Sequence, residues 1–204
     1  MKKILWGILA LVVIVLIVGG VWYIQLRSAA RQWEGPVPEI LSEKLEKDAN
    51  VMEVEFRSRI DAPVADVYRA FTEPERLQEF SDIVRYAKLV RAENNHKAVE
   101  FEMVILGRPQ RLTLEFSFFP QEHRIALKTI ENPLSDVTGE YRLAPSPDGS
   151  KTLLTYTGVT KDKIQLPVPL ALQKSAMREM FTSTIRALKK GLATQQQLIS
   201  GTDS

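Results

Sequence analysis

The sequence predicts an α+β fold in which an antiparallel sheet packs against a long C-terminal helix, with one transmembrane helix before them. Three patterns support this prediction: an uncharged N-terminal run, a series of alternating apolar and polar segments between turn residues, and an amphipathic final segment. Alternation at every second residue is typical of strands, whereas the final segment has the period of a helix. Sequential strands joined by short turns form antiparallel sheets, which commonly have one covered face.

The N-terminal run extends from Ile4 to Leu26 and contains no charged residue. As a helix it would be roughly 34 Å long at about 1.5 Å per residue, and the hydrocarbon core of a bilayer is about 30 Å thick. A cleaved signal peptide typically has a shorter apolar region, of about 7–15 residues. We therefore expect residues 1–26 to form an uncleaved signal anchor, a single transmembrane helix.

Charges beside this run predict its orientation. Lys2, Lys3 and the N-terminal amine precede it, and Arg27 and Arg31 follow it. Because basic residues gather on the cytoplasmic side of membrane helices, we expect the N-terminus in the cytoplasm. The soluble domain would then be extracytoplasmic and attached to the cell (inner) membrane.

Residues 27–51 are expected to link the anchor to the domain. Pro36 and Pro38 stiffen the start of this segment, since proline fixes φ and resists helix formation. Residues 39–47 carry apolar side chains at helical spacing among charged ones, which predicts a short charged helix.

The alternating segments begin at residues 51–60, whose apolar side chains share one face. Two short helices are expected next, at residues 64–72 and 73–80, and each begins near a proline that suits a first helical turn. The later strands are separated by turn residues. They are expected at residues 82–92, 99–105, 112–118, 125 to about 132, 137–143 and 152–159.

The final helix is expected to begin after Pro167 and Pro169 and to end near Ala193, before a polar, disordered tail at residues 194–204. Its apolar side chains fall on one broad face, which must cover the apolar face of the sheet. The opposite face is basic; we expect it to be solvated, and the alternative is contact with anionic lipid headgroups. The apolar face holds Leu170, Met177, Phe181, Ile185, Leu188 and Leu192, and the basic face holds Arg178, Arg186, Lys189 and Lys190.

Three stretches of the chain carry a family resemblance: Phe56–Phe80, Gly139–Gly158, and the start of the last helix at Leu166–Pro169. This order of elements resembles the helix-grip fold of the START and birch-pollen-allergen superfamily. More narrowly, it is similar to the bacterial polyketide cyclase/dehydrase and lipid-transport group. The resemblance implies that residues 52–193 form a curved antiparallel sheet wrapped around the terminal helix.

The resemblance also implies a cavity between the sheet and the helix, in which relatives bind lipids, sterols, quinones or polyketides. Ligand sites in general are concave and mostly apolar. In the alternative interpretation, the same side chains fill an ordinary closed core. The candidate ligand-binding residues are Phe101, Met103, Leu112, Leu114, Phe116, Gly139, Tyr141, Tyr156, Met177 and Phe181.

Composition argues against several kinds of site. The chain has no cysteine, which excludes disulfides and thiolate ligands, and its net charge of +2 predicts no nucleic-acid partner. His96 and His123 fall in expected turns without metal-ligand spacing, so we expect neither a metal nor another cofactor. Thr155, Thr157 and Tyr141 are the only polar side chains expected inside, and none is a good base, so no catalytic residue is assigned.

Three functions fit these observations. The first is membrane-tethered binding or transport of a lipid or other hydrophobic small molecule, with that molecule and the membrane as partners. The second is an enzyme of the cyclase/dehydrase type on the same scaffold. The third is a ligand-free interaction module that assists a membrane complex. We favour the first because the expected interior offers apolar contacts and no evident acid–base chemistry.

Overall fold

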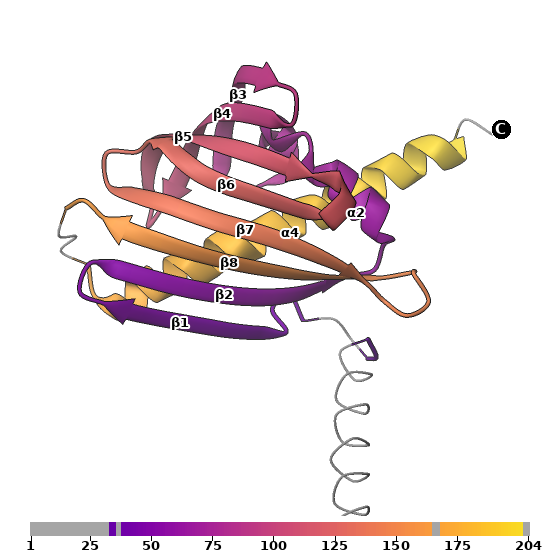
Figure 1. Ribbon diagram of the computed structural model, residues 1–204, viewed down its shortest axis with the longest axis horizontal. Coiled ribbons are helices and arrows are strands. Elements are labelled where there is room, and N and C mark those ends of the chain that lie inside the picture. The colour runs from indigo at the N-terminus through magenta and orange to yellow at the C-terminus, as the bar shows by residue number, and fades with distance from the viewer. Residues whose placement is uncertain (1–32, 36–37, 165–167, 202–204) are drawn as a thin grey trace, which may run out of the picture. The chain divides into compact units, whose positions relative to one another are not determined.

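An eight-stranded antiparallel sheet and a long C-terminal helix make up most of the described chain (Figure 1). The structure is a computed structural model that describes residues 33–35, 38–164 and 168–201. The sheet and the helix belong to the compact unit formed by residues 37–204. The membrane span predicted at residues 4–26 lies outside the described residues, and among those described no helix is long and apolar enough to cross a membrane.

The strands follow the order β1-β2-β8-β7-β6-β5-β4-β3, so β1 and β3 form the two edges of the sheet. Figure 1 shows the last helix, α4, against one face of the sheet. The predicted antiparallel sheet with a C-terminal helix is therefore confirmed. The strands are β1 (Ser42–Asp48), β2 (Val51–Ile60), β3 (Val84–Glu93), β4 (His96–Ile105), β5 (Arg108–Phe119), β6 (Arg124–Glu131), β7 (Ser135–Pro145) and β8 (Thr152–Asp162). The helices are α2 (Val64–Phe71), η1 (Pro74–Arg76), α3 (Leu77–Phe80), η2 (Pro120–Glu122) and α4 (Leu170–Gly201).

Strand β1 replaces the short helix that was expected at residues 39–47, and that expectation is wrong. The segment pairs with β2 along its whole length, with Leu45 opposite Val54. Its few apolar residues fit either period, so helical spacing over so short a segment was a weak signal. Pairing also satisfies backbone groups that β2 would otherwise expose as an edge strand. The sheet thus begins inside the segment that was interpreted as a linker.

The inner face of the sheet and the apolar face of α4 form the core. In β2, Val54, Phe56 and Ile60 are buried, as the alternation predicted. In α4, the buried side chains include Phe181 and Ile185, whereas Leu170 in the first turn is 44% exposed. Leu170 was expected in the core, and this expectation is wrong. Leu188 and Leu192 are also buried.

Helix α4 continues to Gly201, past the expected end near residue 193. Glutamine and leucine are good helix formers, and residues 195–198 are three glutamines followed by a leucine. The polar composition that suggested a disordered tail is therefore compatible with further helical turns.

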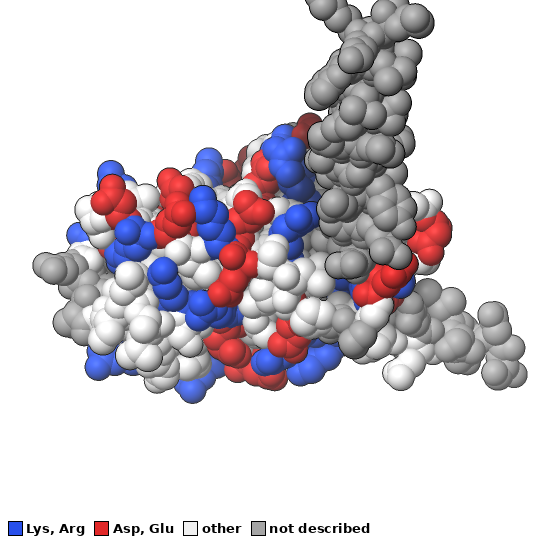
Figure 2. Space-filling view, turned by 90° about the horizontal axis from the view of Figure 1, so that it is seen from below, with Lys and Arg blue, Asp and Glu red and all other residues white. Residues whose placement is uncertain are grey.

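Ion pairs join the basic face of α4 to the chain around β1. Arg186 binds the carboxylate of Glu39 with nitrogen–oxygen distances of 2.7 and 3.0 Å. Arg178 binds Glu43 at 2.8 and 2.6 Å. These two arginines therefore have partners within the domain, which argues against the lipid-headgroup interpretation of this face. On the face seen in Figure 2, basic and acidic side chains are interspersed.

Candidate ligand-binding cavity

A cavity of about 140 Å³ lies between the inner face of the sheet and α4. Strands β2, β4, β5, β6, β7 and β8 form its floor, α4 covers it, and the segment from α2 to α3 contributes to one side. None of its lining residues carries a charge. The lining residues are Val54, Phe56, Ala70, Phe71, Pro74, Leu77, Met103, Leu112, Leu114, Phe116, Leu127, Val137, Tyr141, Tyr156, Thr160, Met177, Met180, Phe181, Thr184 and Leu188.

Eight of the ten residues predicted from the sequence lie around this cavity. They come from strands far apart in the sequence and from α4, and the antiparallel pairing brings them together. Their contact with a ligand stays a prediction. The eight are Met103, Leu112, Leu114, Phe116, Tyr141, Tyr156, Met177 and Phe181.

Phe101, one of the other two, belongs to the closed core. It is 2% exposed, and its ring packs edge-on against Phe116 with 6.2 Å between ring centroids. Alternation correctly placed Phe101 on the inner face. The inner face is wider than the cavity, however, so an inward position does not make a residue part of the cavity wall.

Gly139 is the other predicted residue that does not line the cavity. It makes room for a side chain of the protein instead of a ligand. It lies opposite Gly158 across β7 and β8. A Cβ atom added at either glycine would lie 2.6 Å from the phenolic oxygen of Tyr156. The ring of Tyr156 therefore occupies the space that both missing side chains leave.

Aromatic rings form one continuous wall of the cavity. Tyr141 packs against Phe71 on one side and Tyr156 on the other, with centroid distances of 4.8 and 4.7 Å. Phe181 of α4 stacks on Phe56 of β2 at 4.8 Å, and it lies 6.4 Å from Tyr156. These spacings are those of favourable aromatic pairs, so the wall also fixes α4 against the sheet.

Two phenols in this wall are held in their neutral form. Burial raises the pKa of Tyr141 well above its ordinary value of 10, and the neighbouring Tyr156 raises it further. Burial also raises the pKa of Tyr156, to about 12. Both groups are therefore protonated at neutral pH and act in the cavity as neutral hydrogen-bonding groups.

A sequence comparison shows the family of the chain, and it covers the region that forms the cavity. Residues 52–194 match the model of a family described as polyketide cyclase / dehydrase and lipid transport. The chain belongs to this family. The match begins after β1, so β1 and the acidic residues that pair with α4, Glu39 and Glu43, lie outside the matched region. A comparison with curated proteins gives no match.

Solved structures share the fold of this family member. The Zhui aromatase/cyclase from Streptomyces sp. R1128 is 14% identical with a TM-score of 0.63, over 70% of this chain and 94% of its own. A START superfamily protein from Mycobacterium smegmatis is 14% identical with a TM-score of 0.59, over 70% and 98% of the two chains. A STAR-related lipid transfer protein from Xanthomonas axonopodis is 15% identical with a TM-score of 0.56, over 74% and 98%. At these identities the likeness shows the helix-grip fold alone.

Three polar or flexible residues of the cavity were missed from the sequence. In α4, Thr184 lies three residues after Phe181, and Met180 lies three residues after Met177. Thr160 has the same strand parity as Tyr156. Helical spacing and strand parity were therefore sufficient signals for all three.

Thr155 and Thr157 were expected inside, and this expectation is wrong. Tyr156, between them, faces the cavity, so the alternation of β8 turns both threonines to the outer face. Thr157 lines a hollow on that face. Adjacent leucines at Leu153 and Leu154 made the two faces of this strand hard to distinguish in the sequence.

The hollow on the outer face is larger, at about 550 Å³, but it is a poorer candidate for an apolar ligand. It is broad and open to solvent, and charged side chains such as Glu53, Glu55 and Glu140 line it. Small-molecule sites bury most of the ligand in a largely apolar cleft. The inner cavity has these properties and the outer hollow does not.

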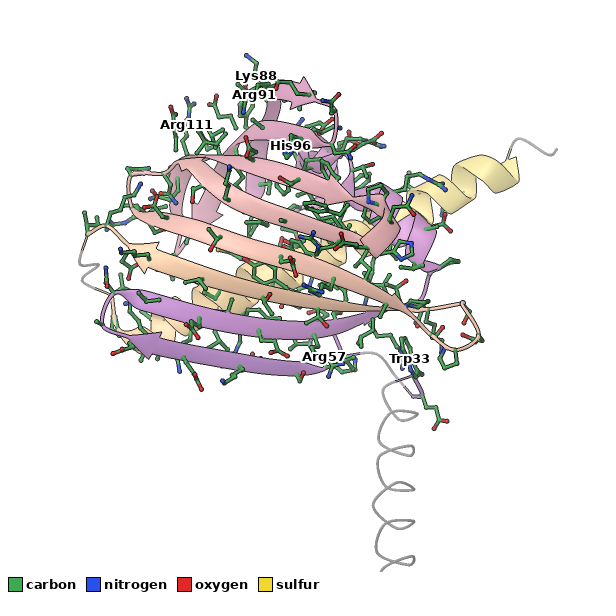
Figure 3. The ribbon with its side chains drawn as sticks, in the orientation of Figure 1. Trp33, Arg57, Lys88, Arg91, His96 and Arg111 are labelled. Atoms are coloured by element: carbon green, nitrogen blue, oxygen red, sulfur yellow. The ribbon has the colours of Figure 1, made fainter. Side chains whose placement is uncertain are left out.

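The two histidines lie away from the cavity. His96 begins β4, and its Nδ1 atom is 2.9 Å from Ser117 Oγ; Figure 3 shows it near Arg91, toward the β3 edge of the sheet. His123 follows η2, and its ring packs edge-on against Tyr68. Within the described part of the chain, no group of three or more acidic or histidine side chains is placed to hold a metal ion.

Proposed function

We propose that this family member binds a hydrophobic small molecule in the cavity between the sheet and α4. The observation that carries the proposal is an internal space whose lining residues are all uncharged and mostly apolar. Burying apolar surface there would stabilise the complex by about 25 cal/mol per Å². The family description includes lipid transport, and one structural neighbour is named as a lipid transfer protein, which supports the same function.

The cavity can adapt to its ligand through its methionines. Three of the five methionines in the chain, Met103, Met177 and Met180, line it. Methionine side chains are unbranched and flexible, and they adjust to irregular shapes. At about 140 Å³ the cavity is smaller than the 300–1,000 Å³ that is usual for ligand sites, so a long lipid would require these side chains or α4 to move.

We propose further that a signal anchor at residues 1–26 tethers the domain to the cell (inner) membrane, with the domain outside the cytoplasm. The uncharged run from Ile4 to Leu26 and the basic residues before it support this topology. A fluorescent protein that matures only in the cytoplasm, fused after Ser204, should stay dark. A periplasmic alkaline phosphatase fused at the same position should be active. The reverse pair of results would contradict the proposed orientation.

The ligand can be sought by native mass spectrometry and organic extraction of the full-length protein. An apolar compound should accompany the wild type and be lost from Ala70→Leu, because Ala70 lines the cavity and the larger side chain fills it. Ala171→Leu is the matched control, since Ala171 is exposed in the first turn of α4. A wild type that carries no apolar compound and takes up no apolar probe would favour the ligand-free interaction module.

A further inference from the structure

The polar atoms in the cavity are few, and one of them has a fixed hydrogen-bonding direction. Thr184 donates its hydroxyl hydrogen to the backbone oxygen of Met180 at 2.9 Å. A hydroxyl has one donor and two acceptor lone pairs, so Thr184 Oγ1 can only accept from any other group. This side chain therefore presents acceptor lone pairs, and no donor, to the cavity.

Tyr141 supplies the complementary group. Its phenol lies close to Thr184, lines the same cavity, and is neutral at physiological pH. Because Thr184 can only accept, a hydrogen bond between the two side chains must be donated by Tyr141. A ligand hydroxyl can insert between the two side chains, because it can donate to Thr184 Oγ1 and accept the hydrogen bond that Tyr141 would otherwise donate to Thr184. A ketone or an ether can only accept. A carboxylate can only accept and would also bring an unpaired charge into an uncharged space, which is strongly unfavourable.

The size of the cavity limits the part of the ligand that enters. An apolar cavity of about 150 Å³ is large enough for benzene, and this cavity measures about 140 Å³. Tyr141 and Tyr156 offer ring faces and edges beside the hydroxyl pair, and aromatic rings pack favourably on such surfaces. One ring fits this space, whereas a fused multi-ring system would enter only if the methionines or α4 moved, which lowers its affinity.

We propose that the cavity selects a neutral single-ring compound with a hydroxyl group, a phenol or a cyclic alcohol, and that Thr184 and Tyr141 bind this hydroxyl. The inference rests on the proposed function, since it names the ligand class of the same cavity.

Methionine methyl groups report directly on this site. The full-length protein would be labelled with [ε-¹³C]methionine, placed in lipid nanodiscs, and titrated with phenol, benzene, benzoate and 2-naphthol. Ligands in the cavity should shift Met103, Met177 and Met180 but not Met52, which is buried outside the lining. Partitioning of each probe into the lipid is measured with empty nanodiscs, and this gives the concentration of probe that is free to bind the protein. Phenol should bind about tenfold more tightly than benzene and more tightly than 2-naphthol, and benzoate should not bind in the cavity.

Thr184→Val tests the hydroxyl pair because valine keeps the shape of threonine and removes the acceptor. The affinity for phenol should fall by about tenfold, while that for benzene should be unchanged. Thr182→Val is the matched control, since Thr182 is buried in the same helix but does not line the cavity. It should change neither affinity.

The possible results separate this inference from the proposed function. Equal binding of phenol and benzene to the wild type, or equal weakening of both by Thr184→Val, would refute the role of the hydroxyl pair. Tighter binding of 2-naphthol than of phenol would refute the single-ring limit. In either case the proposed function stands. If no probe shifts the methyl groups that line the cavity, both the inference and the proposed function are wrong.

Discussion

Gly139 and Gly158 show how one residue type shapes the cavity wall. They face each other across β7 and β8, and the ring of Tyr156 lies over both. Without side chains there, the ring can lie against the sheet and leave space beneath α4. Glycine weakens a strand by itself, so its presence in two paired positions indicates a close approach of this kind.

Gly139→Ala should therefore destabilise the protein. The new Cβ would lie 2.6 Å from the Tyr156 oxygen, and the ring is held between Tyr141 and Phe181. Overpacking of this kind typically costs about 1–3 kcal/mol of unfolding free energy, which urea unfolding would measure.

Gly191→Ala is the contrasting control within the same protein. Its Cβ would lie 3.4 Å from the ring of Phe80, an ordinary contact, and alanine is favoured over glycine in a helix. We expect this change to stabilise the protein by about 0.5–1 kcal/mol. Equal effects of the two substitutions would contradict the packing role assigned to Gly139.

Outside β8, strand parity predicted which side chains point inward, but not what covers them. Phe101 and Phe116 have the same kind of inward position, yet only Phe116 reaches the cavity. The difference depends on where α4 crosses the sheet, which no local pattern contains. The sequence also left open whether Gly139 makes room for a ligand or for a side chain. The residue that fills its space, Tyr156, belongs to the neighbouring strand, and the local sequence does not contain that contact.

At the scale of elements, β1 is the part that local sequence predicted least well. A segment with one inward leucine and many charges fits a helix or a strand, and pairing with β2 decides between them. The longer patterns made correct predictions. The alternating segments predicted the strands, and the broad apolar face of α4 predicted the helix.

The ion pairs between α4 and the β1 region should make that contact sensitive to acid. Hydrogen bonds from Arg186 and Arg178 lower the pKa values of Glu39 and Glu43, respectively, below their ordinary value of 4.5. A lowered folded-state pKa stabilises the contact above the ordinary value, and this stabilisation is lost as pH falls through the lowered pKa. The contact should therefore weaken below about pH 4.5.

Hydrogen exchange of the β1 amides as a function of pH would measure this effect. Glu39→Gln combined with Glu43→Gln should speed exchange in β1 at neutral pH and reduce its acid dependence. The effect should be small, since exposed ion pairs contribute little and are screened by salt. Glu53→Gln, on the outer face of β2, is the control. An unchanged pH profile in the double variant would show that these pairs do not hold β1 to α4.

Helix α4 should be indispensable for the folded state. Its buried side chains Phe181, Ile185 and Leu188 each contribute about 1.5–3 kcal/mol, and a domain is typically stable by only about 5–15 kcal/mol. Truncation after Lys163 should therefore abolish the dispersed NMR spectrum. Truncation after Thr194 should preserve it, because Leu192 is the last described buried residue of the helix. A dispersed spectrum from the shorter chain would contradict the covering role of α4.

At the scale of the whole molecule, the family fold supplies the cavity and the chain adds elements around it. The matched region at residues 52–194 contains the sheet from β2 onward and the described lining residues. The segment before it contributes β1 and the acidic partners of α4. The proposed anchor would place this arrangement beside a bilayer, which is a source of apolar ligands.

Both the proposed function and the ligand class require an open apolar cavity between the sheet and α4. Xenon provides the most direct test, because it enters apolar cavities of about 150 Å³ without requiring knowledge of the natural ligand. Under xenon pressure, the ¹³C-methyl signals of Met103, Met177 and Met180 should shift in the wild type, while that of Met52 should not. The shifts should disappear in Ala70→Leu and persist in Ala171→Leu. Wild-type signals that stay fixed under xenon would show that the core is closed and would contradict the account.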